Sequence, residues 1–376
     1  MVEDVRALLQ DMITKRASDL YLTFGSPPAF RVDDIIHYYE APALTDEDVA
    51  RCMQQLLTPE QFDEYSSTLE LNMASHFDTE ARFRVNVFRQ QTHHGIVIRR
   101  IEHTIPTLKE LNLPPIYGEL AMEKRGLILV SGQTGSGKST SLAGMVGHRN
   151  LYGAGHIITI EDPIEFVHAH NKCIISQRDV GLDTYSYSLA LKNALRQRPD
   201  LVVIGEVRDR EVMEQAIYFA ETGHLCIATI HANNASQTIE RVLNFFPEER
   251  HPQVLLNLSL NLRATLSQRL ITGVTGKRLL ALEIMLNRGL IKQHIEQGKI
   301  RALREMIEKG GSEGMHTFDQ HLYDLCQNQR LISEEVALAE SESTANLRVM
   351  FQNRRMGERG IEVSLRPRDI PPTSNF

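Results

Sequence analysis

Apolar and polar positions follow two different patterns along the chain. In the first hundred residues, short apolar segments bounded by turn residues predict strands at residues 18–24, 30–32, 35–38, 69–77, 81–89 and 95–102. An amphipathic segment from Glu3 to Arg16 predicts one helix, and residues 45–65 predict one or two more. This mixture predicts a small α+β domain over residues 1–103.

Alternation is clearest from Arg82 to Phe88, where polar and apolar side chains follow one another along a single strand. A half-buried strand has this period of two, so Arg82 and Arg84 are expected to face the exterior. Asp33 and Asp34 separate two short strands and predict a hairpin turn.

The pattern changes after residue 103. Residues 104–117 contain Pro106, Pro114 and Pro115 and predict an inter-domain linker. Apolar runs then alternate with helical patterns and predict strands at 127–130, 156–160, 201–204 and 225–230. This alternation predicts an α/β domain with a parallel sheet covered by helices on both faces.

The last third of the chain is predicted to be mostly helical from about residue 234. A continuous apolar stripe predicts a helix over Pro252–Leu270. The second domain is therefore expected to span residues 118–353. Residues 354–376 contain Pro367, Pro371 and Pro372 and are expected to form a flexible tail.

Composition narrows the class of protein. The 376 residues suggest about two to three domains. The 41 Lys and Arg against 48 Asp and Glu give a net charge of -7, which argues against a dedicated nucleic-acid binder. The four cysteines form no C-x-x-C pair, as suits a cytosolic protein without a zinc ribbon. We expect no signal peptide and no membrane span, hence membrane association only through partners.

The most specific chemical pattern is the phosphate-binding motif G-x-x-x-x-G-K-[ST], formed by Gly132, Gln133, Thr134, Gly135, Ser136, Gly137, Lys138 and Ser139. It follows the predicted strand at 127–130 and precedes a helix predicted at 139–148. Backbone N–H groups at such a loop cradle phosphates, the lysine reaches the β/γ-phosphates and the hydroxyl ligates Mg²⁺. Residues 132–139 together with Thr140 are therefore expected to bind ATP and Mg²⁺.

Two predicted strands end in carboxylates. Residues 201–204 lead through Gly205 to Glu206, in the position where nucleotide-hydrolysing enzymes place an acid facing Mg²⁺ and the attacking water. Because Gly205 occupies the usual place of an aspartate, this is an atypical form of that motif. Residues 158–160 lead to Glu161 and Asp162, which either hold metal-bound water or form a polar turn before Pro163.

Two histidines flank the strand predicted at 225–230. His224 precedes it and His231 follows it, and a histidine at a strand exit could hydrogen-bond a γ-phosphate, although a structural role is also open. Arg84 and Arg99 lie on successive strands of the first domain. Such side chains are either solvated or, in a ring of subunits, arginine fingers for a neighbour's γ-phosphate.

These motifs together resemble the PilT/PilU group of type IV pilus retraction ATPases, within the secretion ATPase superfamily. The resemblance covers residues 1–330 and rests on the segments Ala17–Leu20, Arg82–Phe88, Gly132–Ser139, Thr159–Val167, Gly205–Asp209, Ala220–His224 and Thr229–His231. It implies a PAS-like N-terminal domain, a RecA-like ATPase domain with a helical C-terminal part, and a homohexamer.

The resemblance also implies roles for single residues. Glu206 corresponds to the catalytic carboxylate, Glu161 to the acidic box, and His224 with His231 to the histidine box. Arg84 and Arg99 match the family's inter-subunit arginines. Ser139 is expected to bind Mg²⁺ directly, with Glu161 and Glu206 acting through water.

Departures from the PilT pattern indicate the accessory PilU type. Gln133 replaces a usual proline, and the segment Gly289–Ile295 lacks the arginine of a motif that PilT carries after its Glu-Ile-Met sequence. We therefore expect an ATP-hydrolysing motor for pilus retraction and twitching motility. It would lie in the cytoplasm at the inner-membrane base of the pilus machine, with a PilT-type ATPase and the inner-membrane platform protein as partners.

Other functions remain open at this stage. An ATP-binding scaffold subunit with little motor activity would keep the same motifs. A pilus extension or type II secretion ATPase is disfavoured because paired C-x-x-C motifs are missing. A nucleic-acid translocase on the same core is disfavoured by the acidic balance of charge.

Overall fold

The computed structural model describes residues 4–32, 35–75, 77, 79, 81–101 and 104–353. It contains two compact units. The first comprises Met1–Leu111, Tyr117–Arg125 and Ser139–Ile227, and the second comprises Asn112–Ile116, Gly126–Lys138 and Ala228–Phe376. The turn predicted at Asp33 and Asp34 and the tail predicted at 354–376 lie outside the described residues. The predicted domain limits remain a prediction.

A six-stranded sheet forms the N-terminal part of the first unit, in the order β3-β2-β1-β6-β5-β4. The strands are β1 (Asp19–Thr23), β2 (Ala29–Val32), β3 (Ile35–Tyr38), β4 (Glu70–Ser75), β5 (Arg82–Gln90) and β6 (His93–Ile101). All neighbouring pairs run antiparallel. The six strands predicted from the sequence are confirmed.

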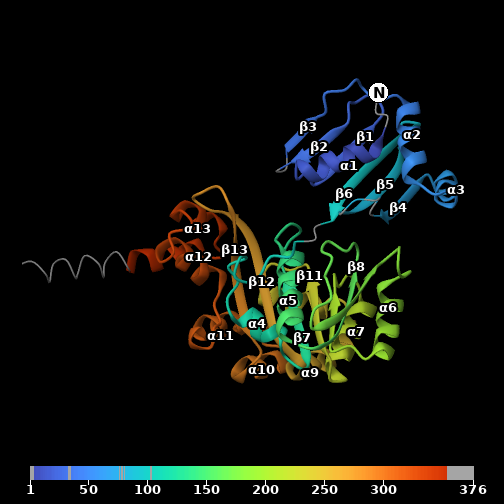
Figure 1. Ribbon diagram of the computed structural model, residues 1–376. Coiled ribbons are helices and arrows are strands. Elements are labelled where there is room, and N and C mark those ends of the chain that lie inside the picture. Colours follow the sequence, from blue (N-terminus) through green and yellow to red (C-terminus); the bar gives the residue numbers. More distant parts are fainter. Residues whose placement is uncertain are drawn as a thin grey trace, which may run out of the picture. The chain divides into compact units, whose positions relative to one another are not determined.

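Three helices accompany this sheet: α1 (Val5–Thr14), α2 (Asp46–Leu56) and α3 (Pro59–Thr68). Reciprocal side-chain caps start the last two, through Thr45 with Asp48 and through Thr58 with Gln61. Figure 1 shows α1 lying along the sheet, where it contacts β1. The apolar residues of both layers form one core, which explains why β4 and β5 alternate between buried and more exposed side chains, whereas the edge strand β3 is exposed throughout.

A seven-stranded sheet forms the second part of the chain, in the order β13-β12-β7-β11-β10-β8-β9. Its strands are β7 (Gly126–Ser131), β8 (Gly155–Glu161), β9 (Cys173–Asp179), β10 (Leu201–Ile204), β11 (Leu225–Ile230), β12 (Leu262–Thr272) and β13 (Arg278–Leu286). β8 runs parallel to β9 and β10, and β7 runs parallel to β12. β12 and β13 form an antiparallel hairpin at one edge.

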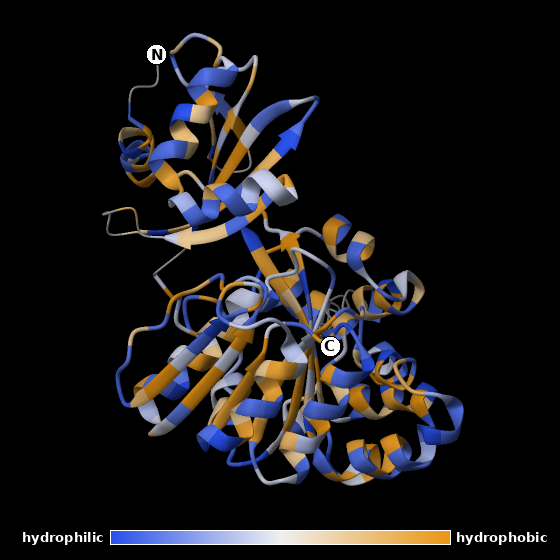
Figure 2. Cartoon of the chain, turned by 90° about the vertical axis from the view of Figure 1, so that its right-hand side faces the viewer, coloured by the Kyte–Doolittle hydropathy of each residue, from blue (hydrophilic) through white to orange (hydrophobic). Residues whose placement is uncertain are grey.

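The inner strands β7, β10 and β11 are buried at every position. Strands covered on both faces need continuous apolar runs, which is why these three were predictable. Figure 2 shows long hydrophobic stretches in the strands of this sheet. Helices described in this part are α4 (Ile116–Ala121), α5 (Lys138–Tyr152), α6 (Tyr187–Ala194), α7 (Arg210–Glu221), α8 (Ala235–Leu243), α9 (His251–Asn261), α10 (Gly289–Glu296), α11 (Leu303–Lys309), α12 (Phe318–Gln327) and α13 (Glu334–Glu340).

The helix predicted over Pro252–Leu270 is wrong in its second half. The helix α9 ends at Asn261, and the next eleven residues form β12. Leucines 255, 258, 262 and 266 recur at helical spacing, but backbone pairing of β12 with β7 and β13 overrides that local pattern. The mostly helical part predicted from residue 234 therefore contains a hairpin, and β9 was not predicted.

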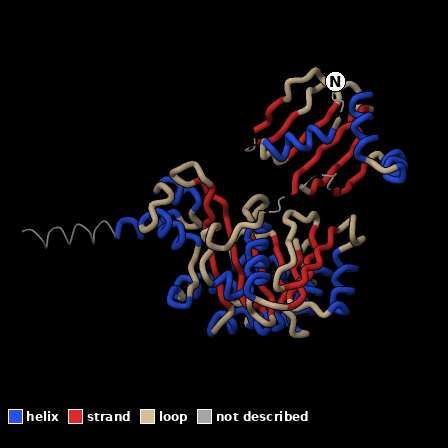
Figure 3. The backbone as a smooth tube through the Cα atoms, viewed as in Figure 1, coloured by secondary structure: helices blue, strands red, loops and turns tan. Residues whose placement is uncertain are grey.

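A separate hydrophobic core holds the C-terminal helices to this hairpin. Its buried members come from β12, β13, α12, the α12–α13 connection, α13 and the segment after α13: Ile271, Ala281, Phe318, Leu322, Leu325, Ile332, Ala337, Leu347 and Phe351. Figure 3 shows these C-terminal helices grouped beside the long hairpin strands. The C-terminal helices are thereby fixed to β12, which runs next to β7.

A buried chain of three hydroxyl groups crosses the second unit. Ser131 Oγ at the end of β7 lies 2.8 Å from Ser267 Oγ on β12 and 2.9 Å from Thr238 Oγ1 on α8. All three side chains are fully buried. Since buried hydroxyls require partners, this chain joins two strands and a helix directly below the Gly132 turn.

Candidate functional site

The segment Gly132–Ser139, called the phosphate loop below, follows β7 and leads into α5. Gly135 and Gly137 have φ values of +76° and +84°, a region that side chains rarely adopt. At Gly132 a Cβ atom would lie 2.6 Å from the backbone oxygen of Gln268 and would also meet the Ser136 hydroxyl. Each glycine therefore has a physical reason, and the loop bends as a phosphate cradle requires.

Lys138 lies across this loop. Its Nζ donates hydrogen bonds to the backbone oxygens of Gly132 and Gln133 at 2.8 and 2.9 Å. The ammonium group is thus held over the loop rather than extended into solvent. Ser136 Oγ is buried and has no hydrogen-bond partner among the described residues. A phosphate oxygen is the kind of acceptor that this hydroxyl and this ammonium group would serve.

Two neighbouring segments support the phosphate loop. Gln268 on β12 is fully buried, and its Nε2 donates to the backbone oxygen of Ser136 at 2.9 Å. Gln133 Nε2 donates to Asn233 Oδ1 at 3.1 Å, which ties the loop to the segment between β11 and α8. The cradle is therefore positioned by side chains far from it in sequence.

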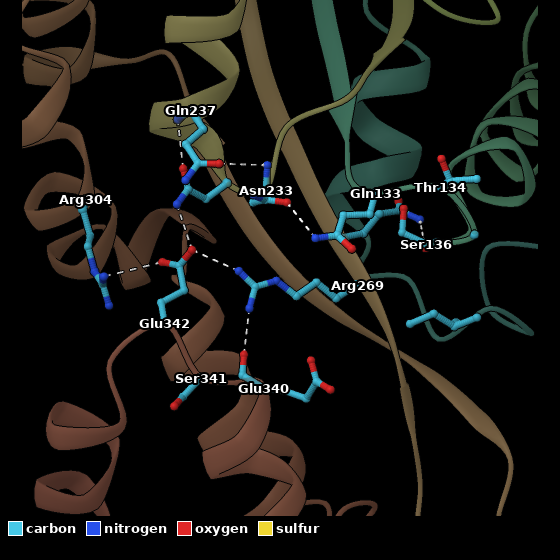
Figure 4. A pocket seen from close by; sticks show the side chains of 14 residues that line it. Gln133, Thr134, Ser136, Asn233, Gln237, Arg269, Arg304, Glu340, Ser341 and Glu342 are labelled. Carbon is cyan, nitrogen blue, oxygen red and sulfur yellow. Dashed lines mark hydrogen bonds and ion pairs between the residues drawn. The ribbon is translucent and has the colours of Figure 1, made fainter.

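A polar cavity of about 700 Å³ opens beside the phosphate loop. Figure 4 shows that its walls come from the loop, the start of α8, β12, α11, the end of α13 and the segment after it. Arg269 and Arg304 supply positive charge, and Glu342 lies between them. This volume is within the range of small-molecule sites in proteins.

The first unit contains an acidic cluster, defined here as Glu161, Asp162 and Glu206 together with Arg208. Glu206 follows β10, and its Oε2 accepts a hydrogen bond from Arg208 Nε at 2.6 Å. Arg208 also donates to Asp162 Oδ2 at 2.7 Å. The Glu206 hydrogen bond is the main reason why the pKa of Arg208 is raised above its usual value. The guanidinium group thus joins the exits of β8 and β10.

Glu161 ends β8 and is held by its neighbours. Its Oε1 accepts hydrogen bonds from Thr159 Oγ1 at 2.6 Å and from Gln177 Nε2 at 3.3 Å. Burial raises the pKa of Glu161 to about 7, against the lowering effect of these hydrogen bonds. Such a carboxylate can change its protonation state near neutral pH.

Gly205 explains why this chain departs from the usual aspartate. A Cβ atom at this position would lie 3.0 Å from Glu161 Cα, 3.1 Å from the Tyr187 hydroxyl and 3.2 Å from the Ile160 oxygen. Two of these three atoms belong to the backbone of β8, so they cannot move aside easily. A side chain before Glu206 would therefore press on β8 and α6 at distances shorter than most Cβ atoms keep.

The two predicted histidines lie at opposite ends of β11. His224 Nδ1 is 3.1 Å from Thr222 Oγ1, and the ring packs edge-on against Phe219 with centroids 5.7 Å apart. His231 lines a cavity of about 580 Å³ together with Gln133 and Thr134 of the phosphate loop. The structure therefore brings His231, but not His224, to the same cavity as the loop within the second unit.

Arg84 and Arg99 face each other across strands β5 and β6. Arg99 Nε donates to Asp19 Oδ1 at 2.8 Å, and Asp19 is only 2% exposed. Arg31 approaches the same carboxylate at 3.9 Å. Asp19 thus fixes one of the two arginines, while an inter-subunit role for them stays a prediction.

The donors at these places fit a magnesium nucleotide. The phosphate loop offers positive-φ glycines, a buried hydroxyl and an ammonium group, which are ligands for phosphate. Ser139 and Thr140 stand in the first turn of α5. Hydroxyl and carboxylate oxygens, as at Ser139, Glu161 and Glu206, are the hard ligands that Mg²⁺ prefers, directly or through water.

Several residues of these sites were not predicted. Arg208 lies inside a motif that the sequence displayed, but nothing in the pattern showed its ion pairs. Tyr187 comes from α6, and its buried hydroxyl approaches Gly205 without any sequence signal. Gln268 was hidden because β12 was predicted as a helix. Glu342 lies far from every motif.

A family model described as Type II/IV secretion system protein matches residues 1–357 of the chain. The type IV pilus ATPase PilU of Pseudomonas aeruginosa is 46% identical over 346 residues, covering 92% of this chain and 90% of that protein. The type IV pilus retraction ATPase PilT of the same organism is 40% identical, covering 89% of this chain and 97% of the relative.

Solved structures give the same answer for the fold. A crystal structure of the pilus retraction motor PilT with bound ADP has a TM-score of 0.84 and 38% identity to this chain. It covers 90% of this chain, which in turn covers 97% of that structure. Within the part of the chain that is described, no helix has both the length and the apolar character needed to cross a bilayer.

Proposed function

Because this chain belongs to the Type II/IV secretion system protein family, we propose that it is an ATP-hydrolysing motor for type IV pilus retraction and twitching motility, of the accessory PilU type. The observation that carries the proposal is the phosphate loop. Its glycines adopt the backbone of a phosphate cradle, and Lys138 lies across its mouth. A turn with a purely structural role could be formed by other residues without the conformational entropy that glycines lose on folding. The glycines therefore favour phosphate binding.

The residues of the loop bind the triphosphate. Backbone N–H groups from Gly135 to Ser139 surround the phosphates, and Lys138 moves from the loop carbonyls to the β/γ-phosphates. Ser139 would hold Mg²⁺, with Glu161 and Glu206 acting through water. The metal ion, when bound, neutralises charge on the transferred phosphoryl group.

Glu206 orients the attacking water. Its carboxylate is the catalytic acid–base group in the proposal, and the Arg208 ion pair sets its direction. Glu161 adds a second carboxylate with a pKa of about 7. His231, in the cavity next to Gln133 and Thr134, lies where it can respond to the γ-phosphate. His224 lies at the opposite end of β11.

Six copies form a ring in this proposal, each with a PAS-like N-terminal domain before a RecA-like ATPase domain. Arg84 and Arg99 of one subunit then stabilise charge on the nucleotide of the next. The ring lies in the cytoplasm at the inner-membrane base of the pilus. A PilT-type ATPase and the inner-membrane platform protein are its partners, whereas nucleic acid is not.

The accessory role is favoured by Gln133. This side chain, where PilT-type loops carry proline, forms a hydrogen bond with Asn233. A second candidate, an ATP-binding scaffold, shares the nucleotide site but lacks turnover. Retraction measured in cells carrying Glu206→Ala protein at normal abundance separates the two, because this variant is expected to bind nucleotide without hydrolysing it, so a scaffold keeps retraction and a motor loses it.

The decisive experiment is turnover of the purified oligomer. We expect Lys138→Ala to abolish nucleotide binding and Glu206→Ala to abolish hydrolysis while ADP still binds. Lys292→Ala, an exposed lysine on α10, is the matched control and keeps both activities. Wild-type turnover in both Lys138→Ala and Glu206→Ala would refute the proposed function.

A further inference from the structure

The end of α13 and the segment that follows it line the same cavity as the phosphate loop. Glu340, Ser341 and Glu342 form part of its wall, and Gln133 to Ser136 form another part (Figure 4). These residues come from opposite ends of the second unit's sequence. The C-terminal segment therefore belongs structurally to the surroundings of the proposed nucleotide site.

A buried carboxylate on α12 fixes the backbone of this segment. The N–H groups of Glu342 and Ser343 donate to Asp319 at 2.8 and 3.2 Å. Arg304 donates to the same carboxylate at 2.7 Å. Because the Asp319 residue is only 4% exposed, the turn around Glu342 cannot shift without uncovering a buried charge.

The Glu342 side chain collects donors from three different elements. Its Oε1 accepts from Asn234 Nδ2 at 2.8 Å and from Arg269 at 3.1 Å. Its Oε2 lies 3.5 Å from Arg304. The carboxylate side chain is 11% exposed, so these interactions are weakly screened by solvent.

Both Asn234 and Arg269 stand next to residues that contact the phosphate loop. Asn233 accepts from Gln133, and Gln268 donates to the backbone oxygen of Ser136. Asn234 is also the N-cap of α8. Arg269 is held further by the Glu340 backbone oxygen at 2.7 Å. Each of these two partners of Glu342 is thus adjacent in sequence to a residue that contacts the loop: Asn234 to Asn233, and Arg269 to Gln268.

We propose that Glu342 is a positioning residue for the nucleotide site, which it shapes through Asn234 and Arg269. This inference rests on the proposed function of the phosphate loop. A fixed Asn234 holds the start of α8 and hence Asn233 against Gln133. A fixed Arg269 holds the end of β12 and hence Gln268 against Ser136. The C-terminal segment thereby helps to preorganise the cradle.

A purely electrostatic role of Glu342 predicts the opposite change in nucleotide affinity when its charge is removed. A carboxylate near an anionic ligand repels it, so removal of the charge alone would strengthen nucleotide binding. Removal of a positioning contact instead weakens binding, because the loop must be ordered again when the nucleotide arrives. The direction of the change in affinity therefore separates the two roles.

The experiment measures the Kd of the full-length oligomer for ADP with Mg²⁺, together with KM and kcat for ATP. For Glu342→Ala we expect Kd and KM to rise about tenfold, the size of one charge-assisted hydrogen bond. For Glu342→Gln, which keeps one acceptor oxygen, we expect a rise of about threefold. In both variants kcat at saturating ATP stays within about twofold, because the catalytic groups are unchanged.

The matched control is Glu335→Gln, which removes the same charge from an exposed position on α13. Its Kd is expected to equal that of the wild type. Unchanged Kd in Glu342→Ala overturns the proposal, and so does tighter binding by Glu342→Gln or an equal loss in the control. If Glu342→Ala does not fold, Glu342→Asp replaces it, since the shorter side chain keeps the charge but not the reach.

Lys138→Ala distinguishes this inference from the function on which it rests. Loss of ADP binding in Lys138→Ala, with wild-type binding in Glu342→Ala, overturns only the positioning role. Wild-type binding in both variants overturns the nucleotide site and the positioning role together.

Discussion

The phosphate loop and the acidic cluster are built from different parts of the chain. The loop uses consecutive residues and mostly their backbone, with φ values of +76° and +84° at Gly135 and Gly137. The cluster uses side chains from the ends of β8 and β10, joined by Arg208. One site therefore depends on local backbone geometry and the other on the pairing of distant strands.

This difference determines how each site fails. A backbone cradle is damaged by strain, whereas a carboxylate cluster is damaged by loss of a charge or by a shift between strands. Binding and hydrolysis should consequently respond to different substitutions, and the following four tests are ordered from the largest expected effect to the smallest.

Glu206→Gln tests the cluster without changing its shape. We expect kcat to fall about a hundredfold or more, because an amide cannot accept the proton of water. The Kd for ADP should stay within about twofold, since the phosphate loop is intact. Glu211→Gln, an exposed position on α7, provides the control with the same chemical change. A parallel loss of binding would show that the two regions are not separable.

Gly135→Ala tests the loop without removing a functional group. Its matched control is Gly276→Ala in the β12–β13 turn, because both glycines have φ of +76° and nothing within 4 Å of an added Cβ. Each substitution should cost about 1–2 kcal/mol of backbone energy. Only Gly135→Ala should weaken ADP binding, by about tenfold, in a fluorescence titration. Equal Kd values for the two variants would contradict a backbone-built cradle.

Gly205→Ala tests the contact between β8 and β10. The added methyl group would press on the Glu161 backbone and the Tyr187 hydroxyl, so we expect the free energy of unfolding to fall by about 1 kcal/mol. Urea unfolding measures it. Adding Tyr187→Phe should recover part of the loss, because that hydroxyl is one of the three obstacles. No destabilisation would mean that the strands can separate, and the aspartate of other enzymes would then fit here.

Glu283→Gln tests a buried carboxylate outside both regions. Glu283 on β13 accepts the N–H of Ala235 at 2.8 Å, and burial raises its pKa to about 7. The folded chain therefore binds this proton more tightly than the unfolded chain, and its stabilising effect is lost as pH rises through about 7.

An amide removes that dependence. The free energy of unfolding of Glu283→Gln minus that of the wild type should become more positive from pH 6 to pH 7, by about 1 kcal/mol. Glu296→Gln, exposed at the end of α10, should give a constant difference. A difference for Glu283→Gln that does not change with pH would refute the buried-acid assignment.

The parts that the sequence could predict are those with local causes. The strands β7, β8, β10 and β11 have continuous apolar runs, and the phosphate loop is a contiguous motif between one of them and a helix. The N-terminal strands could be predicted equally well, because their turns and their alternation of polar and apolar residues depend on neighbouring positions in the sequence. In each case the determining interaction spans only a few positions.

The parts that escaped prediction depend on distant partners. β12 carries leucines at helical spacing and becomes a strand only through its neighbours β7 and β13. The ion pairs of Arg208 join two strand exits, and Tyr187 reaches Gly205 from a separate helix. Glu342 contacts Asn234 and Arg269, which are separated from it in the sequence by several helices and strands. No window of sequence contains both halves of these interactions.

The buried hydroxyl chain of Ser131, Ser267 and Thr238 has a consequence for how such sequences can diverge. Loss of the Ser131 hydroxyl leaves Ser267 Oγ without its partner, and loss of either other hydroxyl removes one of the two partners of Ser131. Thr238 Oγ1 has a further acceptor in the Asn234 backbone oxygen at 2.7 Å. Single replacements are therefore costly, whereas replacement of all three by small apolar residues restores a consistent interior. In sequences that evolve from this chain, the three positions should therefore change together. Sequences with a mixture of polar and apolar residues at these positions should be rare.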